Sequence, residues 1–338
     1  MSESLTSRKK RVFSGIQPSG TLHIGNYLGA IRQWLGDQGL KENFFCIVDM
    51  HAITNVHEPE TLRRQTYDVT ALYLAAGIDP ELSTIFVQSH VRAHAECCWI
   101  LNCVTPVGWL ERMTQFKVKS SQEASVLTGL LDYPVLQAAD ILLYDTDEVP
   151  VGEDQKQHVE LARDIAQRFN HLYGETFVLP QAIIPASGAR IRAFNDPSRK
   201  MSKSEAGIQG HAVRLVDAPD AIRATVQAAV TDSGREIVFS DAPEKTGVNN
   251  LLEIFELLTG QSRPEIEAHF AGRGYNYLKK EVAEVIVENL RPIRDRHQAL
   301  VDDPGEIERI LARGAERARR VAEPKIEQIK RKVGFLVQ

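Results

Sequence analysis

The order of apolar and polar positions divides the chain into two unlike parts. In the first part, the continuous apolar run at residues 44–48 predicts a strand that is buried on both faces, residues 84–87 predict another buried strand, and residues 12–14 predict a short strand. Between these runs, residues 24–35 and 62–76 carry apolar side chains at helical spacing. Strands that alternate with helices are typical of βαβ units, so we predict an α/β fold with a doubly wound parallel sheet.

Beyond residue 205 the pattern is almost wholly helical. Helical periods follow one another at residues 219–229, 249–258, 263–270, 278–300 and 306–333. We therefore place a domain boundary near residue 205. A helical domain is expected over residues 206–297. It is followed by a C-terminal helix, residues 298–338, which we expect to pack back on residues 1–205.

Composition excludes several classes of protein. The chain has 338 residues, of which 43% are apolar and 25% are charged, which is typical of a folded globular protein and excludes a disordered one. No apolar run is long enough for a membrane helix, and the basic residues 1–11 lack the apolar stretch of a signal peptide. Cys46, Cys97, Cys98 and Cys103 have neither disulfide-oxidoreductase nor zinc-finger spacing, so we expect reduced thiols in a cytoplasmic protein.

Charge leaves two interpretations of the C-terminal helix open. The net charge of −5 argues against a protein whose main task is to grip nucleic acid, although it allows a local basic patch. Arginine and lysine are dense at residues 309–332, where glutamates one turn away can pair with them. The segment is therefore either a solvated charged helix or a contact to a phosphate backbone.

A glycine-rich turn, residues 15–26, joins the first predicted strand to the first predicted helix. It ends in His-Ile-Gly-Asn at residues 23–26. Glycine lets the backbone approach a ligand closely, and a helix N-terminus offers free N–H groups to a phosphate. His23 and Asn26 lie one turn apart and can face the same anion. The glycines alone fit a tight strand-to-helix turn equally well.

A second motif, Lys-Met-Ser-Lys-Ser, occupies residues 200–204. Its two lysines are three positions apart, and their flexible ammonium groups suit a clamp on phosphates because they can follow charge onto a leaving group. Taken alone, such a run also fits a solvated loop. The two motifs together form the paired pattern of class I aminoacyl-tRNA synthetases, which the chain resembles. Asn26 in the last position of the first motif is similar to the tryptophanyl branch.

A polar stripe on one predicted helix suggests a pocket wall. Tyr133, Gln137, Asp140 and Tyr144 fall on one face of an otherwise apolar helix. Such side chains must be satisfied either by another part of the protein or by a ligand. A carboxylate in this position would accept a donor such as an indole N–H.

A strand, a turn and the start of a helix follow at residues 149–158. Val149 and Val151 alternate as in a short strand, and Gly152 makes the turn. The two acids that follow suit the first turn of a helix, where the helix dipole favours negative charge. They therefore serve either as caps or as ligand contacts.

Several segments extend the resemblance to the bacterial tryptophanyl-tRNA synthetases. They are residues 49–54, 111–117, 133–144, 149–158 and 230–233. The likeness runs from about Phe13 to the C-terminal helix. It implies a Rossmann-like catalytic domain over residues 1–205 and a helical domain over residues 206–297 that binds the tRNA anticodon.

The resemblance also implies roles for matched residues. Asp140 would accept the indole N–H, while Tyr133, Gln155 and Gln17 would hold the amino and carboxylate groups. The expected tryptophan-binding residues are Phe13, Gly15, Gln17, His51, Tyr133, Gln137, Asp140, Val149, Val151 and Gln155. The expected ATP-binding residues are Gln17, Ser19, Gly25, Asn26, Gly152, Glu153, Asp154, Lys200, Met201, Ser202 and Lys203. The residues expected to act in catalysis are His23, Asn26, Lys117, Lys200 and Lys203.

The sequence departs from the family pattern at two positions. Gln137 stands where many bacterial members have methionine, which would change the pocket floor. Met50 stands where a polar residue is common beside His51. Neither departure removes a charged catalytic group.

The activity implied by the resemblance is that of a tryptophan–tRNA ligase. ATP, accompanied by Mg²⁺, would activate L-tryptophan as its adenylate with release of pyrophosphate. Tryptophan would then pass to the 2′-hydroxyl of the terminal ribose of tRNA(Trp). The resemblance also implies a homodimer, and the sequence assigns no protein ligand to the metal. No editing domain fits in this length, so selectivity would rest on hydrogen bonding in the pocket.

Three other interpretations stay open. A tyrosyl enzyme would use the same scaffold with another amino acid. A small-molecule nucleotidyltransferase would share the His-x-Gly-x turn and would need no helical domain. A synthetase-like protein that binds another enzyme or reports tryptophan would not require the intact histidine, asparagine and lysines of the two motifs.

Overall fold

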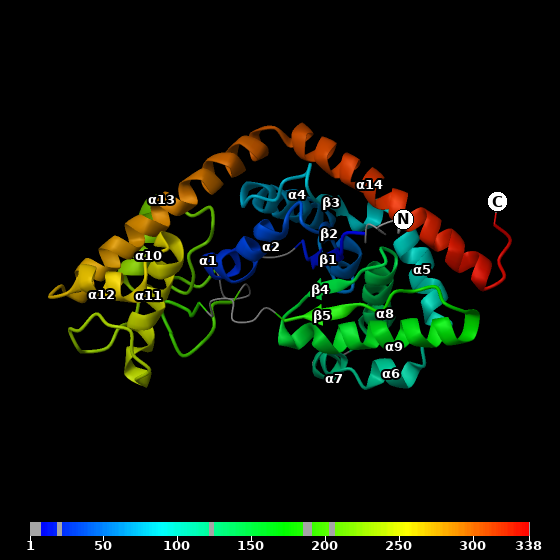
Figure 1. Cartoon of the computed structure of the whole chain (residues 1–338), viewed down its shortest axis with the longest axis horizontal. Coiled ribbons are helices and arrows are strands. Elements are labelled where there is room, and N and C mark those ends of the chain that lie inside the picture. The colour runs from blue at the N-terminus through cyan, green and yellow to red at the C-terminus, as the bar shows by residue number, and fades with distance from the viewer. Residues whose placement is uncertain (1–7, 19–21, 122–124, 185–190, 203–206, 338) are drawn as a thin grey trace, which may run out of the picture.

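The computed structural model describes residues 8–18, 22–121, 125–184, 191–202 and 207–337 (Figure 1). Within these residues, five parallel strands form one sheet in the order β3-β2-β1-β4-β5. Their bounds are β1 Arg11–Ile16, β2 Glu42–Ile47, β3 Thr84–Val87, β4 Glu148–Pro150 and β5 Gln181–Ile183. The order reverses direction at β1, so the predicted doubly wound α/β fold is confirmed.

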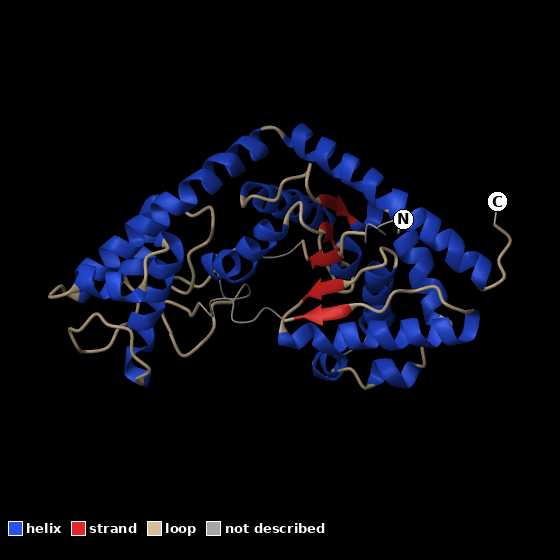
Figure 2. Ribbon diagram, in the orientation of Figure 1, coloured by secondary structure: helices blue, strands red, loops and turns tan. Residues whose placement is uncertain are grey.

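Helices cover both faces of the sheet, as Figure 2 shows. In the first part of the chain they are α1 Ile24–Asn26, α2 Arg32–Asp37, α3 Asp49–Ala52, α4 Pro59–Ala75, α5 Ala93–Asn102, α6 Val107–Glu111, α7 Thr114–Ser120, α8 Thr128–Leu142 and α9 Lys156–Tyr173. A π-helical turn, η1 Tyr27–Ile31, joins α1 to α2, and 3₁₀ turns η2 Gln88–His90 and η3 Glu153–Gln155 precede α5 and α9. The helices predicted over residues 24–35 and 62–76 are therefore present.

Alternate side chains of the strands point into two separate cores. Phe45 and Ile47 of β2 join the cluster that includes α1, α4 and the helical part of the chain. Phe44 and Cys46 of the same strand join a second cluster with α5, α8 and α9. This alternation is the two-residue period of a strand that is buried on both faces, which explains why β2 is an unbroken apolar run.

The described chain beyond residue 207 is helical, as expected. Its helices are α10 Pro219–Gln227, α11 Thr246–Thr259, α12 Arg263–Phe270, α13 Tyr275–Asp302 and α14 Pro304–Lys332, with a 3₁₀ turn η4 Pro243–Lys245 before α11. In Figure 1, α13 runs over the other C-terminal helices and α14 continues, after a bend, over the sheet. The two helices thus form an arch that joins the two parts of the molecule.

Helix α14 packs on the sheet, against β3. Gly314 lies so close to β3 that a Cβ atom there would come within 1.7 Å of the carbonyl oxygen of Ile85. Small residues continue this face of the helix at Ala315, Ala318 and Ala322, all of which are buried. Glycine and alanine therefore let α14 lie directly against the strand backbone.

The segment before the predicted domain boundary packs with the helices. Within residues 191–202, the amide of Met201 donates to the carbonyl of Ile191 at 3.1 Å. The side chain of Asn250 on α11 both accepts from the Arg192 amide, at 2.8 Å, and donates to its carbonyl, at 3.1 Å. By its packing, this segment belongs to the helical part, so the packing changes before residue 205. The boundaries of the functional domains remain predictions.

Candidate functional site

A cavity of about 360 Å³ opens at the carboxyl ends of β1, β2 and β4, beside α8. This is where an open α/β sheet binds its ligand. The cavity brings together every residue that was expected to bind tryptophan, namely Phe13, Gly15, Gln17, His51, Tyr133, Gln137, Asp140, Val149, Val151 and Gln155. Apolar residues from the strand ends supply its walls and a few polar groups face inward, which is the usual design of a small-molecule site.

The carboxylate of Asp140 is held by three side chains. His51 Nε2 lies 2.8 Å from Oδ2, while Gln88 Nε2 at 2.7 Å and His94 Nδ1 at 2.6 Å both lie on Oδ1. Gln88 and His94 are fully buried, and Asp140 is only 1% exposed. The far nitrogen of His94 lies 2.9 Å from the hydroxyl of Tyr144. These contacts fix the orientation of the carboxylate.

Asp140 is an anion with one acceptor position to spare. Burial by itself raises the pKa of Asp140, but the hydrogen bonds from His51 and His94 outweigh burial and bring that pKa below its ordinary value. A carboxylate can accept about four hydrogen bonds. Among the described residues three donors are accounted for, and of these only His51 lies on Oδ2. A ligand N–H in the cavity can therefore bond to Oδ2.

Tyr133 faces the cavity with its hydroxyl fixed by a buried histidine. Its oxygen lies 3.0 Å from His158 Nε2, and the ammonium of Lys119 lies 5.2 Å from its ring centroid. Burial lowers the pKa of His158 to about 4, so the imidazole is neutral at pH 7. A neutral imidazole can hold the tyrosine hydroxyl without placing a buried charge beside it.

The His-Ile-Gly-Asn turn forms the N-terminus of α1. Asn26 N donates to His23 Nδ1 at 3.3 Å, and His23 N donates to Asn26 Oδ1 at 3.2 Å, so the two side chains form a reciprocal capping box. Gly25 lies against the His23 ring, where a Cβ atom would come within 3.1 Å of Nδ1. The Ile24 amide donates to the Val213 carbonyl at 2.9 Å, which ties this turn to the helical part.

The other expected nucleotide-binding residues are spread over two parts of the chain. Gln17 and Gly152 line the cavity, and the carboxylate of Asp154 lies over Gly152, where a Cβ atom would come within 2.7 Å of Oδ1. Glu153, in η3, does not line the cavity. Lys200, Met201 and Ser202 lie on the segment that packs with the helices; there Met201 is buried, and Ser202 N donates to His211 Nε2 at 3.2 Å. Ser19 and Lys203 fall outside the described residues.

Lys117 and Lys119 differ in their relation to the cavity. Both lie on α7, but only Lys119 lines the cavity, together with Gln115. Lys117 is exposed beside it. The structure thus adds a cation that the sequence analysis did not select.

The comparisons with known proteins agree with this geometry. The family described as "tRNA synthetases class I (W and Y)" matches residues 5–291. The chain belongs to this family. Two curated relatives, the tryptophan–tRNA ligases of Wolinella succinogenes and of Caldanaerobacter subterraneus subsp. tengcongensis, are 49% and 50% identical to it, each over 97% of this chain and 99% of the relative.

Solved class I synthetases share the fold. A tryptophanyl-tRNA synthetase from Campylobacter jejuni, complexed with ADP and tryptophan, has a TM-score of 0.86 and 36% identity, and the alignment covers 96% of this chain and all of that one. A tyrosyl-tRNA synthetase from Aeropyrum pernix has a TM-score of 0.65 at 22% identity, covers 91% of this chain and 90% of its own, and shows the fold alone. The predicted family, fold class and enzyme class are confirmed.

Three residues around the pocket of this synthetase were not found from the sequence. Gln88 and His94 hold Asp140, and His158 holds Tyr133. Each is a single polar side chain that the fold buries far along the chain from its partner. His158 ends a segment that the resemblance had already singled out, so its burial in an amphipathic helix was the available signal.

Two further findings concern metal binding and membrane-spanning helices. Among the described residues, no group of three or more histidine, cysteine, aspartate or glutamate side chains could hold a metal ion. No helix of the described chain is long and apolar enough to cross a membrane.

Proposed function

We propose that the chain is a tryptophan–tRNA ligase. A tryptophan carboxylate oxygen attacks the α-phosphorus of ATP, the bond to the bridging oxygen of the β-phosphate breaks, and tryptophanyl-adenylate and pyrophosphate form. In the second step the ribose 2′-hydroxyl of the terminal nucleotide of tRNA(Trp) attacks the activated carbonyl, and AMP leaves. The observation that carries the proposal is the buried Asp140 carboxylate, with its spare acceptor position on the cavity wall.

Asp140 selects the amino acid in this proposal. The indole N–H donates to Oδ2, and Phe13, Val149 and Val151 pack against the ring system. The amino and carboxylate groups bind to Tyr133, Gln155 and Gln17, which line the same cavity. A site built to pair one N–H rejects analogues that lack it, because its own buried polar group is then left without a partner.

The nucleotide lies across the mouth of the cavity and the N-terminus of α1. Asn26 and His23, with the lysines at positions 200 and 203, balance the charge that develops on the departing phosphates. The reaction needs no protein nucleophile, so positioning accounts for most of the acceleration. Mg²⁺ accompanies ATP and neutralises phosphate charge; we assign it no protein ligand and no step.

The helical part supplies the tRNA contacts in this proposal. Residues 206–297 read the anticodon, while the terminal ribose reaches the cavity. Two basic residues of α14 already form ion pairs with the catalytic part. Arg313 and Arg317 pair with Glu81 on the catalytic part, at 3.3 Å and 3.1 Å, so these two cations already have partners within the protein.

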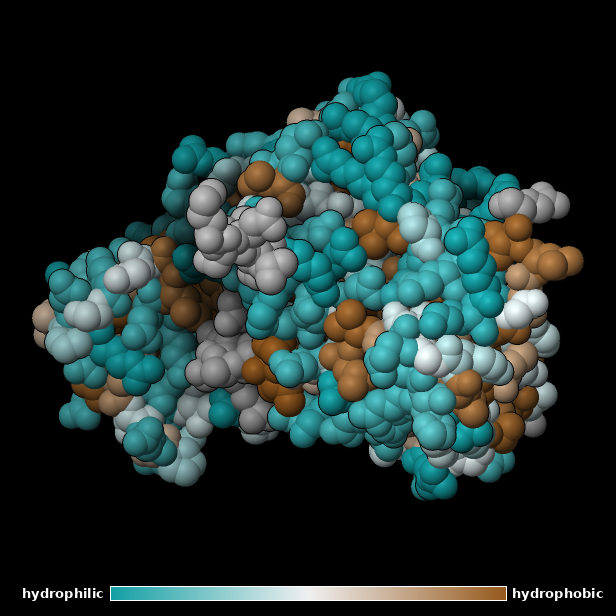
Figure 3. Space-filling view, turned by 45° about the vertical axis from the view of Figure 1, so that its right-hand side comes forward, coloured by the Kyte–Doolittle hydropathy of each residue, from teal (hydrophilic) through white to brown (hydrophobic). Residues whose placement is uncertain are grey.

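A homodimer in the cytoplasm is part of the proposal. Trp99 on α5 is 68% exposed, and Val107 at the start of α6 is 58% exposed. Exposed large apolar residues are suited to a protein interface. Figure 3 shows that hydrophobic residues on the face it presents lie among hydrophilic ones. All four cysteines are free thiols, in keeping with a reducing compartment.

ATP–pyrophosphate exchange with each standard amino acid tests this function. Exchange that depends on tryptophan supports the first half-reaction and excludes the tyrosyl alternative. Charging of a tRNA(Trp) transcript, measured in parallel, supports the second step and excludes a nucleotidyltransferase. The absence of exchange with any amino acid, with or without tRNA, would favour a protein that only binds tryptophan or another enzyme.

A further inference from the structure

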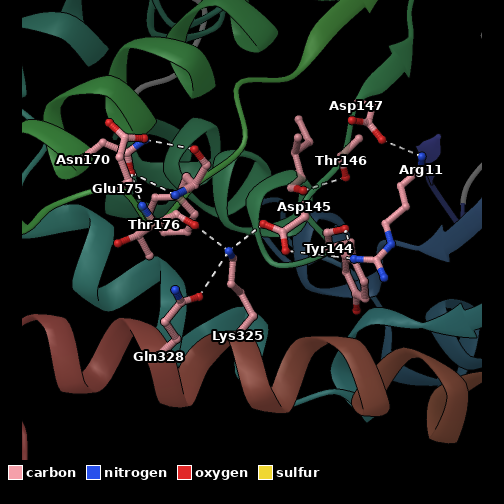
Figure 4. A network of polar contacts seen from close by, with 12 residues as sticks. Arg11, Tyr144, Asp145, Thr146, Asp147, Asn170, Glu175, Thr176, Lys325 and Gln328 are labelled. Carbon is pink, nitrogen blue, oxygen red and sulfur yellow. Dashed lines mark hydrogen bonds and ion pairs between the residues drawn. The ribbon is translucent and has the colours of Figure 1, made fainter. Parts of the chain in front are cut away.

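A buried lysine near the end of α14 contacts the catalytic part. Only 7% of the Lys325 side chain is exposed. Its ammonium lies 2.5 Å from Asp145 Oδ1 and donates to the carbonyl of Thr176 at 2.5 Å, as Figure 4 shows. The side chain of Asp145 is 29% exposed and its Oδ2 also lies 4.0 Å from Arg11 Nη1, so the pair is only partly buried. Apolar residues would dock the helix at least as well as such a pair. The ion pair is therefore suited to fixing a geometry.

Asp145 lies at the turn that ends α8. With φ at +48°, it is the non-glycine residue of the described chain that adopts the left-handed conformation. The residue before it, Tyr144, is held from the other side, because its carbonyl accepts from Arg11 Nη1 at 3.1 Å (Figure 4). Lys325 and Arg11 thus hold one strained turn between them.

The same turn supports the tryptophan pocket. The hydroxyl of the buried Tyr144 lies 2.9 Å from His94 Nε2, and His94 Nδ1 lies 2.6 Å from Asp140 Oδ1. In the neutral tautomer that fits both contacts, Tyr144 donates to His94 and His94 donates to Asp140. Lys325 is therefore connected to the carboxylate on the cavity wall: its partner Asp145 follows Tyr144 in the chain, and Tyr144 reaches that carboxylate through His94.

We call the contacts from Tyr144 through His94 to Asp140 the relay. A second contact from α14 reaches α5, the helix that carries His94. Lys330 lies 2.5 Å from Glu96 on α5, within one turn of His94. The last turns of α14 thus hold both the helix that carries His94 and the turn that carries Tyr144. Earlier along α14, Arg317 docks the helix at Glu81 and Pro80, near the start of β3 and away from the relay.

We propose that Lys325 is a positioning residue for the tryptophan site. Its ion pair with Asp145 keeps the turn at the end of α8 in place, so that Tyr144 and His94 hold the Asp140 carboxylate toward the ligand N–H. The inference rests on the proposed function. It gives the C-terminal helix a role in amino-acid recognition that lies outside tRNA binding.

The test is Lys325→Met, measured in ATP–pyrophosphate exchange without tRNA. Unaltered protein is assayed first, and failure to use tryptophan there overturns the proposed function before any variant is compared. Lys325→Met should raise the KM for tryptophan about tenfold, while the KM for ATP stays within about twofold. The KM for benzothienylalanine, in which sulfur replaces the indole N–H, should stay nearly constant because that ligand does not use Asp140. Equal losses for both amino acids would overturn the inference.

Arg317→Gln is the matched control. It removes a charged contact between the same helix and the same part of the protein. It therefore measures how weaker docking of α14, by itself, changes the KM for tryptophan. We expect it to leave the KM for tryptophan within about twofold. A rise equal to that of Lys325→Met would mean that α14 acts through general stability, and it would overturn the inference.

Tyr144→Phe keeps the proposal testable if Lys325→Met does not fold. It removes one hydroxyl and leaves the buried ring, so it should raise the KM for tryptophan to a similar extent. In the double variant the two effects should not multiply, since both act through the His94 contact. Multiplied effects, or no effect of Tyr144→Phe, would show that the relay does not carry the influence of Lys325.

Discussion

The two ends of the proposed site are built differently. At the amino-acid end, His51, His94 and Gln88 all hydrogen-bond to Asp140, and every residue expected to bind tryptophan lines a single cavity. At the nucleotide end, the expected residues come from the turn at residues 23–26, the turn at Gly152 and the segment at Lys200–Ser202, which packs with the helices. A rigid network suits the choice of one amino acid, whereas phosphate binding draws on two parts of the chain.

The largest expected effect lies at the amino-acid end. Asp140→Asn keeps the size of the side chain but removes the charge that three donors surround. We expect kcat/KM for tryptophan in pyrophosphate exchange to fall about 1,000-fold, while the KM for ATP changes less than about threefold. Gln137→Met, which restores the residue common in the family, serves as the control on the same helix face and should stay within about tenfold. Equal losses for both substrates would contradict the role of Asp140.

The effect of pH on the free energy of unfolding also tests the amino-acid end of the site. The pKa of His158 is about 4 in the folded protein because the imidazole is buried, and about 6.5 when the chain is unfolded. The folded state therefore binds fewer protons, so the free energy of unfolding is unaffected by His158 above pH 6.5 and falls as the pH drops toward 4, by up to about 3 kcal/mol.

Chemical denaturation at a series of pH values measures this change. His158→Gln should flatten the curve between pH 6.5 and 4. An unchanged slope in the variant would show that other groups cause the loss. Asp140 acts in the same direction at lower pH, because its folded pKa lies below the ordinary value and its stabilisation is lost as it is protonated.

Lys200→Ala addresses the nucleotide end. The lysine is exposed in the free protein and is proposed to stabilise charge on the phosphates, so its loss should lower kcat of exchange about 100-fold. Tryptophan affinity, measured by calorimetry in the absence of ATP, should stay within about twofold. Arg199→Ala, one residue earlier, is the control for charge alone. Loss of tryptophan binding in Lys200→Ala would mean that the two ends are not separate.

The smallest effect concerns the cap of α1. Asn26→Ala removes one half of the reciprocal cap with His23, which should lower the free energy of unfolding by about 1 kcal/mol. Asn26→Asp keeps an oxygen acceptor and should recover that stability. If it also recovers exchange, Asn26 acts mainly as a cap; if exchange stays low, the amide itself contacts phosphate, as the proposal requires.

The sequence predicted those elements of the fold in which apolar side chains recur in a regular pattern. The run at β2 is almost wholly apolar because both faces of the strand are buried. The strand and turn before α9 were also predicted, from the alternation at Val149 and Val151 and from Gly152. β5, residues Gln181–Ile183, was missed because three partly exposed residues carry no period. The sequence led us to expect that the C-terminal helix packs back on residues 1–205, but its charges did not show which element it meets. That contact depends on Gly314, whose missing side chain admits the backbone of β3.

The site was predicted where motifs cover it and missed where contacts are long-range. Tyr133 and Asp140 share a helix face, so spacing alone placed them together. His94 reaches Asp140 across 46 positions of the chain, and a single buried histidine has no neighbours in the sequence that reveal its partner. Lys117 was selected because it ends the segment at residues 111–117 that resembles the family, whereas Lys119 lies beyond that segment.

The most direct test of the whole account compares two ligands on the unaltered protein. Tryptophan and benzothienylalanine have nearly the same shape, but only tryptophan has the N–H that Asp140 is proposed to accept. In ATP–pyrophosphate exchange the account predicts a kcat/KM at least about 100-fold lower for benzothienylalanine. Equal values for the two ligands would mean that the cavity recognises shape alone, and that Asp140 serves only to hold its histidines.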